Sequence, residues 1–390
     1  MVRFRLRCAI AGVGLVAAAP LFVQWRTQVA WTAFESELRI LARAHAARPA
    51  QRVAAFGDTT EAHAWTHYDL ATTLARPLAD TDNTELVATL RRSDAQVAAE
   101  TADLRARWQP VLAALHAGAH AGDVRQEATR LRHTGNMLVD RWIANMAVFT
   151  ARAALHEGRD LEAVQSTLDG ATFAADRMRT GTLIDQVIGA AVLAICTSEV
   201  WTEARLDQLD EVALATLHTG LDRIDASLPT TLDLASEYLE LGRILHDVPQ
   251  DGADWLPKGS LWCMLSPRWM LADAFVQAAA MARRLDTTAS VAWPERRLDL
   301  EQPLPASALS NPMLAVMLPN LASCEGSRRE ALSLLRLLRM SVALHLGEPA
   351  PRLDDPLGSG PLAIAEESDS MRLSSVGSAK RATLARVVVR

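Results

Sequence analysis

The chain has 390 residues, of which 49% are hydrophobic and 22% charged, and its formal net charge at pH 7 is −6. This composition can bury a large core, so it excludes an intrinsically disordered chain. Only two of the 40 basic residues are lysines, and the arginines are dispersed, so no basic stripe predicts a nucleic-acid partner.

The first segment, residues 1–26, has the pattern of a membrane anchor. Three arginines lie within the first seven residues, an uncharged run extends from Cys8 to Trp25, and Arg26 follows it. At about 1.5 Å per residue, a helix over this run would be roughly 27 Å long, enough to cross the hydrocarbon core of a bilayer. Positive charge before the span predicts a cytoplasmic N-terminus, with the bulk of the chain on the periplasmic side.

The same segment also has features of a cleaved signal peptide. Ala17–Ala19 supply the small residues that a cleavage site needs, but Pro20 would follow the cut and disfavours cleavage. We therefore expect a retained, single-pass anchor that contacts the inner (cytoplasmic) membrane through residues 8–25. A cleaved signal peptide and a buried core helix are the alternatives.

The first part of the body predicts helices separated by prolines. Apolar residues recur at helical spacing in 31–47, and Pro49 is expected to end that helix. A second helix is expected near 61–75 with a stop at Pro77. A third is expected to begin after Thr84 and to run toward Pro110, followed by a short helix over 111–118.

The clearest helix pair covers 136–158 and 159–181, with Gly158 and Gly181 as the expected stops. Residues 182–201 are apolar nearly all round, so this helix should lie at the centre of the body. Further helices are expected over 206–224, 230–245, 267–285 and 327–347, with a tryptophan-containing loop at 247–266.

Strand signals are nearly absent, so the sequence predicts an all-α protein. An N-terminal membrane helix (1–26) would be followed by a body of antiparallel helical hairpins (27–346) and by an irregular or weakly β tail (347–390) rich in Pro, Gly and Ser. Gly158 and Ala163 lie where a tetratricopeptide-like hairpin needs a turn and a close contact, so a TPR-like α-solenoid is the expected architecture.

Several motifs of the tail and body occur together in one order. They are GRDLEA and TLIDQVIG in the central helices, NPMLAVMLPNL before the last long helix, and LGEPAPRL, DDPLGSGPL and MRLSSVGS in the tail. In this the chain resembles an uncharacterised family of planctomycete-type envelope proteins, over roughly residues 135–380. The resemblance implies a single N-terminal anchor, a helical envelope domain, a tail similar to the C-terminal part of pseudopilins, and no known reaction.

The tail departs from that family at two points. The family's tyrosine before Ser-x-Gly is missing from the stretch Leu373–Gly377, and the acidic residues that would follow it are replaced by SAKRATLARVVVR. A calcium site is therefore not expected. We expect residues 378–390 to form a frayed basic terminus, and contact with an anionic surface is the alternative.

Two histidine pairs have the spacing of metal ligands. His63 and His67 are expected on one helix face near Glu61 and Asp69, and His116 and His120 share the same four-residue spacing near a helix end. Such pairs bind zinc when a third ligand arrives from elsewhere. The sequence indicates no third ligand, so we expect no metal ion, no cofactor and no catalytic residue.

The four cysteines form no Cys-x-x-Cys pair. Cys8 lies in the expected anchor, and Cys196 lies in an apolar stretch and should be a buried structural thiol. Whether Cys263 and Cys324 form a disulfide in an oxidising compartment stays open.

These patterns together favour a membrane-anchored envelope scaffold without catalytic activity. Its protein partner would bind a contiguous face of residues 60–250, as on other stacked helical proteins. The tail supports a first alternative, a subunit of a secretion or pilus-like assembly. The second alternative is a metal-dependent hydrolase that gathers His63 or His67 with carboxylates from another helix.

Overall fold

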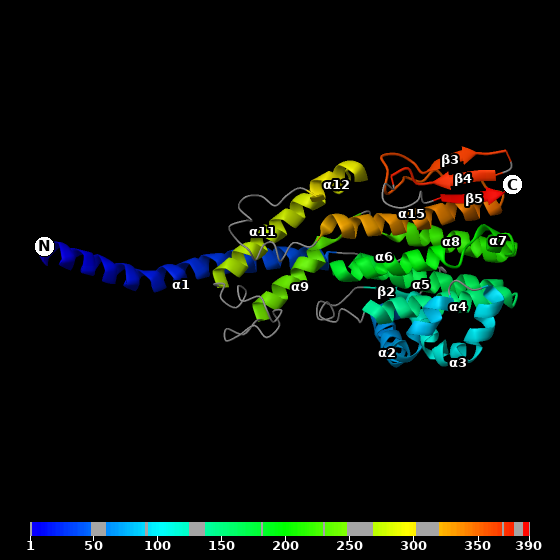
Figure 1. Ribbon diagram of the computed structural model, residues 1–390, viewed down its shortest axis with the longest axis horizontal. Coiled ribbons are helices and arrows are strands. Elements are labelled where there is room, and N and C mark those ends of the chain that lie inside the picture. The colour runs from blue at the N-terminus through cyan, green and yellow to red at the C-terminus, as the bar shows by residue number, and fades with distance from the viewer. Residues whose placement is uncertain are drawn as a thin grey trace. The chain divides into compact units, whose positions relative to one another are not determined.

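The computed structural model describes residues 2–47, 60–89, 93–124, 137–180, 182–228, 231–247, 268–301, 320–368, 370–377 and 385–389. Helices dominate these residues, which confirms a mostly helical protein (Figure 1). Contacts divide the chain into unit 1, with residues 1–47, 234–285 and 302–319, and unit 2, with residues 48–233, 286–301 and 320–390. The sequence predicted a different division, based on composition, into segments 1–26, 27–346 and 347–390. That division stays a prediction.

Unit 1 is built from α1 (Val2–Ala46), α9 (Leu234–Asp247) and α11 (Arg268–Thr287). The ring centroids of Phe34 and Phe275 lie 4.7 Å apart, which joins α1 to α11. Helix α9 approaches both of them at Gly242, where an added Cβ would lie 2.7 Å from Leu38 and 2.8 Å from Phe275. Close packing in unit 1 therefore depends on a residue without a side chain.

The expected anchor lies within the single helix α1. The side chains of residues 2–21 lie outside the described part of the chain. Among the residues that are described, none of the helices combines the length and the apolar character needed to cross a membrane. Membrane contact through residues 8–25 stays a prediction.

Unit 2 contains most of the helices. They are α2 (Ala64–Thr89), α3 (Asp94–Ala119), α4 (Met137–His156), α5 (Asp160–Thr180), α6 (Leu183–Ser198), α7 (Glu203–Leu206), α8 (Glu211–Ser227), α12 (Trp293–Glu301) and α15 (Leu321–His345). Helices that follow one another from α2 to α6 pack side by side, and α6 contacts α4, α5 and α15 (Figure 1). Most of α6 is buried, which confirms its predicted central place. A TPR-like arrangement of these helices stays a prediction.

Two prolines that were expected to end helices lie inside them. Pro77 lies within α2, and Pro110 lies within α3, which continues unbroken to Ala119. A proline removes one backbone N–H and displaces the carbonyl four residues before it. Those carbonyls belong to Thr73 and Ala106, which are exposed like the prolines themselves, so water can bind them. The predicted helix ends at Pro77 and Pro110 are wrong for this reason.

Glycine ends helix α4 as predicted. Gly158 has φ of +71°, a left-handed conformation that residues with a Cβ avoid. Its N–H donates to the Leu155 carbonyl at 3.2 Å, and the Arg159 N–H donates to the Ala154 carbonyl at 2.8 Å. These two bonds form a Schellman motif, which turns the chain directly into α5. The other expected stop, Gly181, lies outside the described residues.

Two small sheets accompany the helices of unit 2. The strands β1 (Thr60–His63) and β2 (Ala121–Asp123) pair in parallel. In the tail, β3 (Ala363–Glu366), β4 (Ser370–Ser374) and β5 (Ala385–Val389) form an antiparallel sheet in that order. The tail sheet lies along α15 (Figure 1).

The tail sheet has its own small core and an ionic contact with the helices. Leu373 and Val388 are buried against Leu337 of α15. Arg386 donates from Nε to Glu203 Oε1 and from Nη2 to a backbone carbonyl, both at 2.6 Å. The expected frayed terminus is therefore wrong for residues 385–389, because the buried Val388 and the bonded Arg386 hold them as a strand.

The centre of unit 2 contains a buried arginine between two carboxylates. Arg177 Nη2 lies 2.9 Å from Asp140 Oδ1, and its Nη1 lies 2.6 Å from Asp185 Oδ1. All three side chains are at most 5% exposed. The guanidinium also lies over the rings of Trp65 and Phe173, at 5.5 and 5.0 Å from their centroids. A single side chain of α5 thus joins α2, α4 and α6.

Replacing this arginine should destabilise unit 2 strongly. We expect Arg177→Met to lower the free energy of unfolding by about 3–5 kcal/mol, because two buried carboxylates would lose their cation. Chemical denaturation followed by circular dichroism measures the loss. Arg141→Met, at an exposed position of α4, is the control and should stay within about 0.5 kcal/mol of the unchanged protein. Equal losses in the two variants would contradict a structural role for Arg177.

Candidate functional site

A groove opens where α3, α4 and α5 of unit 2 meet. Its cavity volume is about 490 Å³, and we name it the α3–α5 groove. Its lining residues are Arg105, Gln109, Leu112, Ala113, Leu115, His116, Thr150, Arg159, Glu162, Gln165, Ser166 and Asp169. Each lining position of α3 and of α5 has another lining position three or four residues away, which places each set on one face of its helix.

Two lining residues of the groove, His116 and Asp169, lie beside a second histidine, His120. His116 and His120 lie one turn apart on α3, and their ring centroids are 4.3 Å apart. From α5, Asp169 Oδ2 lies 2.9 Å from His116 Nδ1, and Asp169 Oδ1 lies 3.9 Å from His120 Nε2. One potential ligand atom from each of the three residues lies within 4.8 Å of the other two. Within the described residues, this trio has the composition of a metal site.

Burial sets the electrostatics of the trio. Asp169 is only 5% exposed, and its carboxylate is costly to bury without a cation. A hydrogen bond with Asp169 raises the pKa of His116 above its ordinary value, although partial burial opposes the shift. The Gln165 side-chain nitrogen lies 3.1 Å from His116 Nδ1 and adds a second contact to the ring. The trio therefore attracts positive charge, either a proton or a metal ion.

The rim of the groove carries charges of both signs. Arg105 donates to Glu157 at 2.8 Å, and Arg159 donates to Glu157 and to Glu162. Hydrogen bonds from Arg105 and Arg159 lower the pKa of Glu157 to about 2, so this carboxylate stays ionised at neutral pH. A rim of paired charges does not have the concentrated positive charge that a nucleic-acid site needs.

The other predicted histidine pair is arranged differently. His63 ends strand β1, whereas His67 lies in α2, which begins only at Ala64. The expectation that both share one helix face is wrong, because the chain changes from strand to helix between them. Among the described residues, neither belongs to a group of three potential metal ligands. The neighbouring Asp69 is exposed, and the side chain of Glu61 lies outside the described residues.

Asp169 is the residue of the trio that sequence reasoning missed. The His116–His120 spacing was visible in the sequence, but Asp169 follows 53 residues after His116 in an ordinary helical pattern. Only the packing of α5 against α3 brings it to the histidines. The single helpful signal was the amphipathic face of α5, on which Gln165 and Asp169 lie one turn apart.

The predicted structural thiol is confirmed. Cys196 is fully buried in α6, and its burial raises the pKa of the thiol to about 12. Gly170 of α5 leaves room for it, because a Cβ there would lie 2.8 Å from the sulfur. Cys263 and the side chain of Cys8 lie outside the described residues, so the disulfide with Cys324 is not tested.

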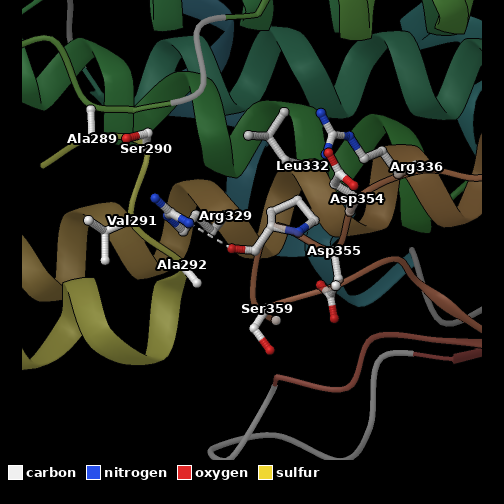
Figure 2. A pocket seen from close by; sticks show the side chains of 13 residues that line it. Ala289, Ser290, Val291, Ala292, Arg329, Leu332, Arg336, Asp354, Asp355 and Ser359 are labelled. Atoms are coloured by element: carbon white, nitrogen blue, oxygen red, sulfur yellow. Dashed lines mark hydrogen bonds between the residues drawn. The ribbon is translucent and has the colours of Figure 1, made fainter.

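A second cavity, of about 470 Å³, lies between α15, residues 289–292 and the turn at 354–360. Figure 2 shows that Arg329 and Arg336 of α15 point toward this turn. Arg329 Nη1 donates to the Pro356 carbonyl at 2.9 Å, and Arg336 Nη1 donates to the Asp354 carbonyl at 2.7 Å. Both arginines are thus bonded to the walls, which makes the cavity part of the structure that holds the tail.

Asp355 is the centre of that structure (Figure 2). Its carboxylate accepts hydrogen bonds from the Ser375 hydroxyl at 2.9 Å, the Val376 N–H at 2.8 Å and the Leu357 N–H at 3.0 Å. The side chain is buried, and the bonds join the turn to the residues that follow β4. The second cavity therefore has a structural explanation, and the α3–α5 groove is the better functional candidate.

Comparison of the chain with protein-family models, with curated proteins and with solved structures found no match.

Removing the Asp355 carboxylate should release the tail. We expect Asp355→Ala to abolish amide-exchange protection in 354–377 and 385–389, whereas α3 to α6 should stay protected. The reason is that three hydrogen-bond donors lose a buried acceptor, and each loss costs about 1–3 kcal/mol of stability. Hydrogen–deuterium exchange with mass spectrometry measures this. Asp354→Ala, at the exposed neighbouring position, is the matched control. Equal exchange in both variants would show that Asp355 does not hold the tail.

Proposed function

We propose that the chain is a non-enzymatic helical interaction protein whose α3–α5 groove binds an extended segment of another protein. The observation that carries the proposal is a groove of about 490 Å³ whose walls are packed helices. Such a volume accommodates several side chains of a bound segment. Rigid walls reduce the entropy that binding costs.

The polar groups of the groove suit a polypeptide. Gln109 and Gln165 offer amide donors and acceptors, which can pair with a peptide backbone. Thr150 lines the groove, and its hydroxyl has no hydrogen-bond partner within the described part of the chain. The rim carries the positive Arg105 and the negative Glu162, so it favours a segment that also carries both positive and negative charges.

The membrane attachment of this protein is part of the same proposal. Residues 8–25 would hold the chain in the inner membrane with unit 2 on the periplasmic side, as a TPR-like scaffold near the membrane surface. Two observations support it: the uncharged run follows three arginines, and the run lies within one continuous helix from Val2 to Ala46.

A subunit of a secretion or pilus-like assembly is a second candidate. The specific observation in its favour is the antiparallel sheet β3-β4-β5 at the end of the chain, where the resemblance to pseudopilin tails was noted. This sheet packs on the long helix α15 through Leu337, Leu373 and Val388. Polymerisation of the chain in isolated envelopes would favour this candidate over the interaction scaffold.

Site-specific crosslinking tests the groove. A photoreactive amino acid at Gln109 should give a discrete protein adduct in intact cells, because a segment bound in the groove would touch this exposed position. The same amino acid at Val212, 66% exposed on α8, is the control and should give no such adduct. Mass spectrometry of the adduct distinguishes a polypeptide from a lipid. No adduct at Gln109, or the same adduct at both positions, would contradict the proposal.

Fractionation tests the anchor. The full chain should stay in the membrane pellet after alkaline extraction and should retain its N-terminal peptide in mass spectrometry. Val13→Arg combined with Val16→Arg should release it, since each arginine at the centre of a span costs about 2.5–3.5 kcal/mol. Val16→Ala serves as the matched control. A soluble protein that begins near residue 20 would instead identify a cleaved signal peptide.

A further inference from the structure

We propose that His116, His120 and Asp169 form a binding site for a divalent transition-metal ion, with zinc as the best fit. The three side chains come from two helices of unit 2, and two of them, His116 and Asp169, line the α3–α5 groove. The proposal is independent of the protein partner proposed above, because it concerns the isolated chain.

The geometry is close to that of a zinc site. Zinc binds imidazole nitrogen and carboxylate oxygen at about 2.0–2.2 Å, so neighbouring ligands of a tetrahedral ion lie roughly 3.4 Å apart. The ligand atoms of the trio lie within 4.8 Å of one another, with separations of 2.9 Å between His116 and Asp169 and 3.9 Å between His120 and Asp169. Rotation of the side chains alone would therefore bring them to binding distances.

The charge of the trio suits a cation. Asp169 is 5% exposed, and its carboxylate lies 2.9 Å from His116 and 3.9 Å from His120. Neutral imidazoles do not balance a buried carboxylate, whereas a protonated imidazole or a metal ion does.

The donor set selects the class of metal. Two imidazoles and one carboxylate suit zinc and its neighbours among the transition metals, whereas calcium and magnesium require mostly oxygen ligands. Gln165, one turn before Asp169 on α5, contacts the same ring, with its side-chain nitrogen 3.1 Å from His116 Nδ1.

The groove leaves a position open beside the ion. Three protein ligands and an adjacent cavity of about 490 Å³ are the arrangement in which zinc keeps one exchangeable ligand, such as water. Both ligand-bearing helices are packed into unit 2, because Leu115 and Ala119 of α3 are buried beside the histidines and α5 contacts α3, α4, α6 and α8. The site therefore needs little reorganisation to bind an ion.

Zinc binding to the purified chain tests the proposal. The full chain, stripped with a chelator, is titrated with zinc chloride by calorimetry, and its melting temperature is recorded with and without the metal. We expect one zinc ion per chain and a raised melting temperature, since the ion binds the folded state. Cobalt(II) in place of zinc should give a visible absorption spectrum of a four-coordinate site with nitrogen and oxygen ligands.

Variants assign the binding to the trio. His120→Ala and the isosteric Asp169→Asn should each weaken zinc binding at least about tenfold, whereas His218→Ala on α8 should leave it unchanged. Circular dichroism shows whether each variant is folded. Failure of the unchanged chain to bind zinc would overturn the proposal. Equal binding by all folded variants would overturn it as well, because the ion would then lie elsewhere.

Discussion

The packing of unit 2 depends on the ion pairs that the buried guanidinium of Arg177 forms with two carboxylates. It contacts Asp140 of α4 at 2.9 Å and Asp185 of α6 at 2.6 Å, deep in the core. The second oxygen of Asp185 accepts from the Thr182 N–H at 3.0 Å and so caps the start of α6. Burial raises the pKa of Asp140, and Arg177 opposes that rise. Because any shift of α4, α5 or α6 would separate buried charges, this cluster fixes the register of all three helices.

The same helix that carries Arg177 also shapes the α3–α5 groove. Asp169 lies on α5 two turns before Arg177, so the cluster that positions α5 also positions the carboxylate of the trio. Gly170 and Cys196 bring α6 close to α5 at the same level of the core. The groove is therefore built on helices whose places are set elsewhere in the core. Helices position the lining side chains more precisely than a surface loop would. A partner or an ion that binds in the groove therefore meets a preformed site.

Long amphipathic segments were predictable, and long-range contacts were not. Helices α5 and α6 and the turn at Gly158 follow from periodicity and from one glycine, which act locally. Pro77 and Pro110 misled the prediction because their effect depends on solvent access to a carbonyl one turn away, which the sequence does not show. Strand β5 needed its partner strand and the Glu203 contact. For the site, the histidine spacing was local, but Asp169 reaches it only through the packing of α5 on α3.

The proposed metal and the proposed partner interact through charge. With a neutral His116, the trio carries the single negative charge of Asp169; a zinc ion would change this to a single positive charge. The floor of the groove would then attract a carboxylate of the bound segment and offer it the open metal position, while Arg105 and Arg159 stay paired with Glu157 at the rim. Metal occupancy would thus select acidic segments over basic ones. In the metal-free protein the same floor favours a positively charged group, so the two states of one groove would prefer opposite partners.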